Sequence, residues 1–273
     1  MDLDKKTYDA FAKLLYDRCG IALGDQKEAL MSARVGKRLR ALGLNNYKEY
    51  LDIISATGPQ SDTEFTEFMN VMTTNTTSFF REKDHFDFMS AAVQNMMEEG
   101  RNKVRIWCAA SSSGEEPYTL AMTFLESAQG FRGDCRILAT DIDINILTQA
   151  RAGEYSEQKM QGVPPQLRQK YFTAAGAGKD RIYKAGPTLA NMITFSRLNL
   201  AKPPFPMKGP FDIIFCRNVM IYFDNLVRKN LMAEFERLLR PGGYLMVGHS
   251  ESMAGGLCNL PSAGRPSVYV KPG

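Results

Sequence analysis

The sequence around residue 110 runs from an apolar stretch through a turn of small residues directly into a helical pattern. Residues 104–110 predict a strand, residues 111–114 read Ser-Ser-Ser-Gly, and residues 118–125 have helical periodicity. Small residues let the backbone approach a ligand closely, while the first helical turn presents unpaired N–H groups and the positive end of its dipole. Pro117 suits that turn because proline has no N–H to leave unpaired. The combination predicts a binding site of nucleotide size, as in a cofactor-dependent enzyme.

A second predicted strand ends in acidic residues. Asp141 and Asp143 follow the predicted strand at residues 135–140, and an acidic side chain at this point is where α/β folds bind ribose hydroxyls. The turn at 109–114 lacks the Gly-x-Gly-x-x-Gly pattern expected for a dinucleotide. A tight turn with a solvated Asp141 is therefore the alternative interpretation.

The composition is ordinary for a soluble globular protein. The 273 residues, 44% apolar and 23% charged, suffice for one large or two modest domains. No stretch approaches the roughly 20 apolar residues of a membrane span, and the polar first residues do not resemble a signal peptide. We therefore expect a cytoplasmic protein. The net charge of +4 is too small to identify a partner.

The cysteines and histidines exclude several kinds of site. The five cysteines have no Cys-x-x-Cys spacing, and three lie in predicted strands, which favours buried reduced thiols. His85 and His249 are the only histidines, so a histidine-rich metal site is excluded and a His-centred triad is not expected. We predict no metal, and a structural or surface role for His85.

The chain divides by pattern into a helical part and an alternating part. The first 72 residues show amphipathic helical periodicity without strand-like alternation, which predicts a separate helical domain. Its predicted helices lie at residues 7–18, 27–42, 47–55 and 63–73. A threonine-rich polar stretch then predicts a linker, which we place at residues 73–90.

Residues 91–273 predict an α/β domain, because strands and helices alternate as in a mostly parallel sheet covered on both faces. The predicted strands lie at residues 104–110, 135–140, 192–196, 211–216, 243–248 and 267–271. The alternation lapses at about residues 160–195, where paired prolines and short extended pieces indicate an inserted element, such as a small antiparallel hairpin.

Five short motifs occur in order along the chain. They read Asn-Thr-Thr-Ser-Phe-Phe-Arg-Glu (75–82), Ala-Ala-Ser-Ser-Ser-Gly-Glu-Glu-Pro-Tyr (109–118), Ala-Thr-Asp-Ile-Asp (139–143), Cys-Arg-Asn-Val-Met-Ile-Tyr-Phe (216–223) and Gly-His-Ser-Glu-Ser (248–252). Together they closely resemble the CheR-type chemotaxis receptor methyltransferases. The similarity extends over nearly the whole chain, and five co-occurring motifs are far more specific than any one of them.

The resemblance implies an all-helical N-terminal domain followed by a class I, Rossmann-like S-adenosylmethionine-dependent methyltransferase domain with a small antiparallel β insertion. It also implies methyl transfer to glutamate side chains of chemoreceptor cytoplasmic helices, for adaptation in bacterial chemotaxis, with S-adenosylhomocysteine as the second product. The chemistry is consistent, because a glutamate with a pKa of about 4.3 is already ionised and nucleophilic at neutral pH. Groups that position the reactants should therefore matter more than proton carriers.

The resemblance also assigns cofactor contacts to particular residues. They are Asn75, Thr77, Arg81, Glu116, Asp141, Asn199, Leu200, Arg217 and Asn218. Glu116 is expected at the cofactor ammonium and Asp141 at the ribose hydroxyls, with Glu115 as the alternate to Glu116. Asn199 and Leu200 resemble the adenine-edge contacts of the family.

Two residues are assigned catalytic roles by the same resemblance. Arg81 carries a guanidinium that can hold a carboxylate of the cofactor or of the incoming glutamate. We favour steering, because a tightly held glutamate would lose nucleophilicity. Tyr222 resembles the family tyrosine that faces the transferring methyl, with a core aromatic as the alternative.

Two surfaces are candidates for receptor contact. Arg34, Lys37 and Arg40 belong to a basic helix face, which is typical of a solvated surface but in the family docks on acidic receptor helices. The inserted element corresponds to a β-subdomain that in some members binds a receptor C-terminal tail peptide by strand addition. Its Ala174–Gly178 stretch departs from the peptide-binding versions, so this contact stays open. Recruitment to membrane-bound receptor arrays, without membrane insertion, is implied.

Other functions are less consistent with the sequence. A nucleic-acid methyltransferase lacks support because no Asn/Asp-Pro-Pro-Tyr segment and no suitably placed Pro-Cys nucleophile occur, and positive charge is confined to one helix. A catalytically silent scaffold is possible on fold grounds alone, but the complete set of predicted site residues argues against it. A nicotinamide dehydrogenase would need the missing glycine pattern.

Overall fold

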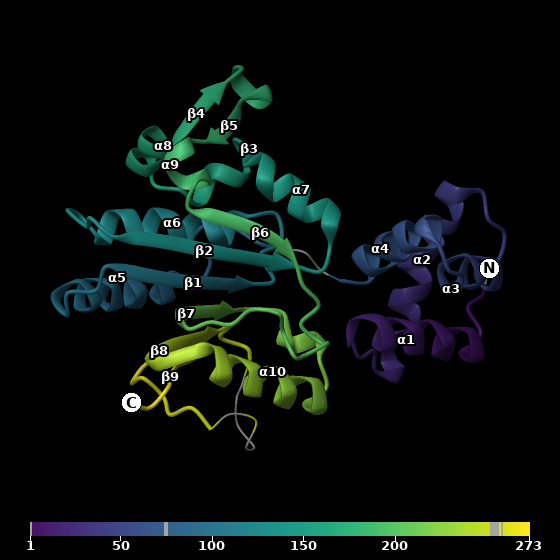
Figure 1. Ribbon diagram of the computed structural model, residues 1–273. Helices are drawn as coiled ribbons and strands as arrows, with labels where there is room; N and C mark the ends of the chain where they lie inside the picture. Colours follow the sequence, from purple (N-terminus) through teal and green to yellow (C-terminus); the bar gives the residue numbers. More distant parts are fainter. Residues whose placement is uncertain (1, 74–75, 252–256, 258) are drawn as a thin grey trace. The chain divides into compact units, whose positions relative to one another are not determined.

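The computed structural model describes residues 2–73, 76–251, 257 and 259–273, and the chain divides into two units (Figure 1). The first comprises Met1–Thr76 with Tyr222–Val227, and the second Thr77–Ile221 with Arg228–Gly273. The first is helical and the second is built on a sheet, which confirms the predicted fold class. Within the described residues, no helix combines the length and apolar character needed to cross a membrane.

Residues 2–73 form four α-helices, as the periodicity predicted. They are α1 (Lys5–Cys19), α2 (Glu28–Leu42), α3 (Tyr47–Ser55) and α4 (Pro59–Met72), with a short 3-10 turn, η1 (Asp25–Lys27), before α2. Asp4 caps α1 by accepting the N–H of Thr7 at 2.7 Å, and Gly20 ends it in a left-handed conformation. α4 begins before the predicted residue 63, because a proline in the first helical turn loses no hydrogen bond.

Aromatic packing and a partly buried ion pair stabilise the helical unit. The ring centroid of Phe11 lies 5.3 Å from that of Phe68 and 6.1 Å from that of Tyr50. Arg38 donates from Nε and Nη2 to the two oxygens of Glu64 at 2.7 and 2.6 Å, and Tyr50 donates its hydroxyl to Glu64 at 2.8 Å. Burial and the hydrogen bond to Glu64 raise the pKa of Tyr50, so this hydroxyl stays protonated.

Residues 222–227 cluster with the helical unit although they come from the second half of the chain. The backbone carbonyl of Tyr222 accepts the N–H of Ala22 at 2.8 Å. Tyr16 donates its hydroxyl to Asp224 at 2.7 Å. Hydrogen bonds between distant parts of the sequence therefore complete this unit.

The second unit contains a six-stranded sheet with the order β6-β2-β1-β7-β8-β9. The strands are β1 (Lys103–Ala109), β2 (Asp134–Asp141), β6 (Ile193–Arg197), β7 (Phe211–Cys216), β8 (Leu239–Val247) and β9 (Val268–Val270). All neighbours are parallel except β8 and β9, which confirms the predicted mostly parallel sheet. β8 begins before the predicted residue 243, because Leu239 already pairs with Phe211. The carboxyl ends of β2, β1 and β7 are adjacent, as at the ligand-binding edge of open α/β sheets.

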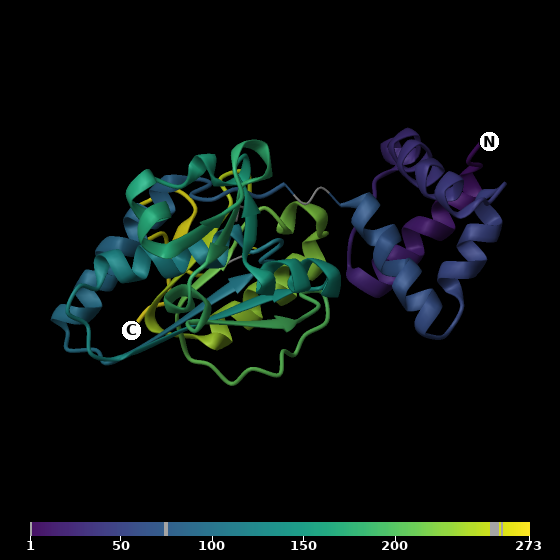
Figure 2. The same cartoon turned by 90° about the horizontal axis from the view of Figure 1, so that it is seen from above.

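Helices cover both faces of this sheet (Figure 1, Figure 2). They are α5 (Lys83–Glu98), α6 (Glu115–Ser127), α7 (Ile144–Ala152) and α10 (Asn225–Leu238). Buried residues of α5 and α6 form one core cluster with Ile106 and Cys108 of β1. Trp107 points to the opposite face, where its ring centroid lies 5.3 Å from that of Phe235 of α10. Alternation along β1 thus divides the core into two layers.

A smaller antiparallel sheet lies between α7 and β6 in the chain, near the top of Figure 1. Its strands have the order β3-β5-β4, one strand more than a hairpin. They are β3 (Glu154–Ser156), β4 (Phe172–Ala175) and β5 (Ile182–Ala185), with η2 (Lys159–Gly162), α8 (Pro165–Tyr171), η3 (Gly178–Asp180) and α9 (Pro187–Ala190) between and after them. The ring of Phe79 packs edge-on against those of Tyr155 and Phe172, which ties the insertion to the segment before α5.

The cysteines within the described residues are free thiols. Cys108, Cys135 and Cys216 lie in strands of the large sheet, as predicted. Burial raises the pKa values of all three, so these thiols are protonated at neutral pH. Cys258 lies outside the described residues.

Candidate active site

The turn between β1 and α6 is tight, as its small residues predicted. Ser112 has a φ of +47° and Gly114 a φ of +96°. A Cβ at residue 114 would lie 2.6 Å from the hydroxyl oxygen of Tyr155, so glycine is required there. The N–H of Ser111 donates to the carbonyl of Thr140 at 2.8 Å, which joins the turn to the end of β2.

Asp141 ends β2 beside this turn, and backbone groups hold its carboxylate. Ser112 donates its N–H to Oδ2 at 2.9 Å, and Asp143 donates to Oδ1 at 3.1 Å. Burial raises the pKa of Asp141, against the lowering effect of these hydrogen bonds. Asp143 instead caps α7 by accepting the N–H groups of Asn145 and Ile146. Of the two aspartates, Asp141 therefore faces the turn.

Glu115 and Glu116 have different partners, which distinguishes the two alternates. Glu116 accepts from Nη1 of Arg217 at 2.8 Å through one oxygen and from the thiol of Cys108 at 3.2 Å through the other. Burial raises the pKa of Glu116, and the Arg217 charge opposes this. Glu115 is fully buried and pairs with Lys159 of η2 at 2.6 Å. Glu116 thus lies with the predicted site residues, while Glu115 joins the turn to the insertion.

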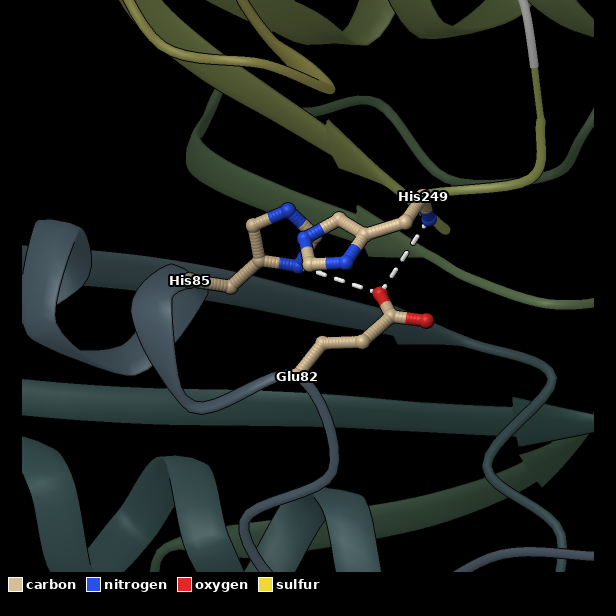
Figure 3. Close-up of side chains that lie close together, drawn as sticks. All are labelled: Glu82, His85 and His249. Carbon is tan, nitrogen blue, oxygen red and sulfur yellow. Dashed lines mark hydrogen bonds and ion pairs between the residues drawn. The ribbon is translucent and has the colours of Figure 1, made fainter.

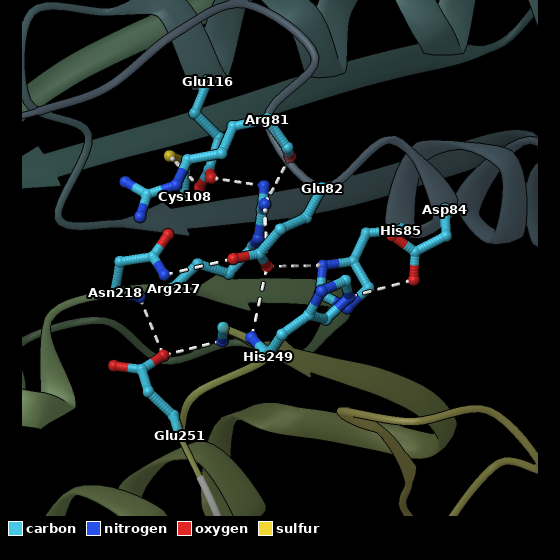
Figure 4. Close-up of polar contacts among 11 residues, drawn as sticks. Arg81, Glu82, Asp84, His85, Cys108, Glu116, Arg217, Asn218, His249 and Glu251 are labelled. Carbon is cyan, nitrogen blue, oxygen red and sulfur yellow. Dashed lines mark hydrogen bonds and ion pairs between the residues drawn. The ribbon is translucent and has the colours of Figure 1, made fainter.

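Arg217 is the centre of a polar network at the end of β7 (Figure 4). Besides Glu116, it pairs with Oε2 of Glu82 at 3.1 Å and donates to the backbone carbonyl of Arg81. Its side chain is 1% exposed, and two phenylalanine rings lie 5.5 and 5.9 Å from its guanidinium carbon. Burial favours the neutral form of Glu82, but the Arg217 charge and hydrogen bonds bring the pKa of Glu82 below its ordinary value. The positive charge of Arg217 thus stabilises the negative charges of both Glu82 and Glu116.

Glu82, His85 and His249 form a cluster whose potential ligand atoms lie within 4.8 Å of one another (Figure 3). Oε2 of Glu82, however, already pairs with Arg217 and accepts the N–H of His249 at 3.3 Å. A metal bound there would face the Arg217 cation, so we assign none. His85 is fully buried, and this lowers its pKa to about 4, which keeps the ring neutral at pH 7. Its burial is consistent with a structural role.

Comparison with protein families agrees with this geometry. Residues 75–261 match the family model described as the S-adenosylmethionine-binding domain of CheR methyltransferase, and residues 6–73 match its all-alpha domain. The chain belongs to the CheR methyltransferase family. It is therefore an S-adenosylmethionine-dependent methyltransferase.

Named relatives cover most of this CheR-family chain. A chemotaxis protein methyltransferase of Salmonella typhimurium is 38% identical over 242 residues, 89% of this chain and 82% of the relative. One from Borreliella burgdorferi is 36% identical over 263 residues, 93% of this chain and 91% of the relative. The similarity thus extends through both units.

The site residues fit the cofactor of the CheR family. Ser111 Oγ, Ser112 Oγ and Arg217 Nε are buried and have no hydrogen-bond partner within the described part of the chain. Buried polar atoms are seldom left in this state unless a ligand or water engages them. The nearby carboxylates of Glu116 and Asp141 are acceptors suited to ammonium and hydroxyl groups. S-adenosylmethionine carries both kinds of group.

The other predicted cofactor contacts lie in two segments. Asn75 falls outside the described residues, and Thr77 is half-buried before α5. After β6, Leu200 is buried, and Oδ1 of Asn199 accepts the N–H of Ala201 at 3.0 Å. Their cofactor contacts stay predictions.

The predicted catalytic and docking residues of the helical unit differ in environment. Tyr222 ends η4 (Met220–Tyr222) and clusters with the helical unit, and its catalytic role stays a prediction. Lys37 and Arg40 are exposed on α2. Arg34 is half-buried and donates to the carbonyls of Val71 and Met72 at 3.0 and 3.1 Å. It therefore caps the end of α4, whatever its part in docking.

Sequence reasoning did not single out two carboxylates of the network, Glu82 and Glu251. Glu82 pairs with Arg217, and Glu251 is buried and accepts the backbone N–H of Asn218. Both belong to motifs that carried the family resemblance, at 75–82 and 248–252. Their place in those motifs is the signal that could have identified them.

Proposed function

We propose that this CheR-family enzyme methylates glutamate side chains on the cytoplasmic helices of chemoreceptors, giving the glutamate methyl ester and S-adenosylhomocysteine. The observation that carries the proposal is the set of polar groups at the carboxyl edge of the sheet: Glu116 in the first turn of α6, paired with Arg217 after β7, and Asp141 at the end of β2. The relatives of this chain are named chemotaxis protein methyltransferases. The enzyme acts in adaptation, in the cytoplasm, recruited to membrane-bound receptor arrays.

This reaction makes small demands on proton transfer. An acceptor glutamate has a pKa of about 4.3 and is ionised at neutral pH. S-adenosylmethionine supplies, when bound, an electrophilic sulfonium methyl. Transfer neutralises a carboxylate and a sulfonium together, so the protein mainly orients the groups and excludes water. Burial of the site network, with its fixed charges, suits that task.

Each site residue has a proposed role. Glu116 accepts from the cofactor ammonium, because one of its oxygens is engaged by a thiol, which is a weak donor, and retains acceptor capacity. Asp141 accepts from the ribose hydroxyls, and Asn218 supplies a further contact. Arg81 steers the incoming glutamate, and Tyr222 faces the transferring methyl.

Receptor docking is proposed on α2. Lys37 and Arg40 are exposed there, and Arg34 belongs to the same basic face. Acidic receptor helices would be attracted over a distance of about 8 Å at physiological ionic strength. Such steering raises the association rate more than the affinity.

A receptor tail peptide is proposed to add to the small sheet of the insertion. β4 is an edge strand of that sheet, and residues 173–175 are exposed. Edge strands offer unpaired backbone groups to an extended peptide. Residues 174 and 175 are alanines, so backbone hydrogen bonds would contribute more than side-chain pockets.

The test is transfer of labelled methyl from S-adenosylmethionine to a purified chemoreceptor cytoplasmic fragment, followed by mild alkali. Release of the label as methanol, abolished when receptor glutamates are changed to alanine, would establish glutamate methylation. Alkali-stable label would indicate a different acceptor, such as nitrogen. An Asp141→Asn variant serves as control, because a loss of transfer there links the activity to this site.

A further inference from the structure

The turn after β7 is held by a carboxylate that is not itself a predicted cofactor contact (Figure 4). Glu251 is 1% exposed. Through Oε2 it accepts the N–H of Asn218 at 2.8 Å and that of Gly248 at 2.6 Å, and through Oε1 it accepts the N–H of Met220 at 2.7 Å. All three donors are backbone groups, so the carboxylate fixes the path of the chain. Hydrogen bonds to an ionised acceptor are about twice as strong as neutral ones.

The backbone path at this point is one that needs support. Asn218 has a φ of +58°, in the left-handed region that residues other than glycine seldom occupy. Gly248 approaches so closely that a Cβ there would lie 2.6 Å from Nδ2 of Asn218 and 2.7 Å from Oε2 of Glu251. The ends of β7 and β8 therefore meet through Glu251, and Asn218 is confined between them.

A second carboxylate orients the side chain of Asn218. Its Nδ2 donates to Oε1 of Glu82 at 3.2 Å. An ionised carboxylate accepts hydrogen bonds and cannot donate them, so the amide nitrogen must face Glu82. The amide oxygen consequently points away from Glu82 (Figure 4).

We propose that Glu251 is a positioning residue of the cofactor site: it holds the turn after β7 so that Asn218 presents its amide oxygen to the cofactor. The inference rests on the proposed role of Asn218 as a cofactor ligand. The group that this oxygen recognises is an N–H or O–H donor, such as the ammonium or a ribose hydroxyl of S-adenosylmethionine. Glu251 acts through Asn218 and makes no contact of its own with the cofactor.

The test compares Glu251→Gln, Asn218→Ala and the double variant, with S-adenosylhomocysteine affinity measured by calorimetry and stability by thermal unfolding. Glutamine keeps the size of Glu251 but turns an NH₂ group toward backbone donors. We expect Glu251→Gln to lower affinity at least tenfold in the native background and less than twofold in the Asn218→Ala background.

Glu234→Gln is the matched control. Glu234 is also a buried carboxylate that accepts a backbone N–H, that of Phe205 at 2.8 Å, but it pairs with Arg237 outside the site network. Its variant should lose stability yet keep affinity within twofold. If Glu251→Gln does not fold, Glu251→Asp replaces it, with a smaller loss of affinity that again disappears beside Asn218→Ala.

The outcomes separate the inference from the proposed function. The positioning role would be overturned if Glu251→Gln binds S-adenosylhomocysteine normally, or if the losses of affinity add in the double variant. If Asn218→Ala still binds S-adenosylhomocysteine more weakly than the native protein, the proposed site stands in either case. Normal affinity in Asn218→Ala would overturn both the ligand role of Asn218 and the inference built on it.

Discussion

The helical unit and the sheet unit each contain an arginine–carboxylate pair shielded from solvent at least in part, but the two pairs are satisfied to different degrees. In the helical unit, Arg38 engages both oxygens of Glu64, and Tyr50 adds a third hydrogen bond. In the sheet unit, Arg217 gives one nitrogen to Glu116, whose other oxygen accepts a thiol. The first pair is saturated, whereas the second retains capacity for further hydrogen bonds.

On this difference we distinguish a structural network from the network that we propose binds the cofactor. A pair whose hydrogen bonds are already made has little capacity left for a ligand, and removing one partner leaves an uncompensated charge. Around Arg217, by contrast, burial raises the pKa of Glu116, and Arg217 Nε has no partner within the described residues. A bound cation would favour the ionised form of Glu116, and a bound acceptor would supply a hydrogen-bond partner for Arg217 Nε. Buried polar groups with unused hydrogen-bonding capacity at a strand end therefore distinguish the proposed site better than buried charge alone does.

The largest effect is expected from Arg81→Ala, which removes a side chain at the unsaturated network. Its backbone carbonyl, which accepts from Arg217, is kept. We expect the methyl-transfer kcat to fall about 10³-fold, or about 4 kcal/mol, with less than about a tenfold loss of cofactor affinity. Steady-state kinetics and calorimetry measure the two quantities.

The control for Arg81→Ala is Arg136→Ala, at an exposed arginine of β2 that pairs with Asp134. It should leave both quantities unchanged. Equal losses of turnover and of cofactor affinity in Arg81→Ala would instead identify Arg81 as chiefly a cofactor ligand.

A glutamate-to-glutamine substitution in each network should affect different properties of the protein. Glu64→Gln should lower the free energy of unfolding by about 2 kcal/mol, because it leaves the partly buried Arg38 without its charge partner. Cofactor affinity should not change. Glu116→Gln should weaken cofactor binding at least about tenfold, roughly 1.4 kcal/mol, with a smaller loss of stability, because Arg217 keeps Glu82.

Urea unfolding measures the stability of both variants, and calorimetry measures their cofactor affinity. If Glu116→Gln proves the more destabilising and binds cofactor normally, the distinction between the two networks is wrong.

The free energy of unfolding should depend on pH through His85, which is neutral although charged groups of the site network lie beside it. Burial lowers the pKa of His85 from 6.5 to about 4. Between these pH values the unfolded chain binds a proton that the folded chain does not, so the free energy of unfolding falls as the pH falls from 6.5 to 4. The loss is at most about 3 kcal/mol, and His85→Gln should remove it.

The measurement is the difference in unfolding free energy between the native protein and His85→Gln across this pH range. Because the chain has two histidines, their ring proton signals in NMR can also be assigned by substitution. A His85 ring that titrates near pH 6.5 would contradict the prediction.

The smallest effect concerns the docking face of the helical unit. Charge reversal at Lys37 and Arg40 should raise the KM for receptor several-fold and flatten its salt dependence, because the steering field is reduced. Arg34 is reversed separately, since its loss also uncaps α4. Stability should therefore fall in the Arg34 variant and stay constant in the Lys37/Arg40 variant. An unchanged salt profile in the latter would remove the docking role.

Much of the fold could be predicted because its signals are local. Periodicity located the helices of the first unit and the strands of the large sheet to within a few residues at most boundaries. Differences arose where a neighbouring element sets the boundary. β8 is extended by its pairing with β7, and the small antiparallel insertion, which was predicted, contains a third strand in addition to a hairpin. Pairing partners are distant in sequence and leave no local periodicity.

The sequence by itself determined the family and the cofactor, and it indicated the strand ends where we place the proposed site, because motifs and hydrophobic patterns are properties of neighbouring residues. Tertiary structure alone decided that Glu116 meets Arg217 while Glu115 meets Lys159. Adjacent residues on a helix differ by about 100° in direction, so what surrounds the helix selects between them. It also decided that Glu82 and Glu251 both hold Asn218, since residues so far apart in sequence are brought together by the packing of the sheet.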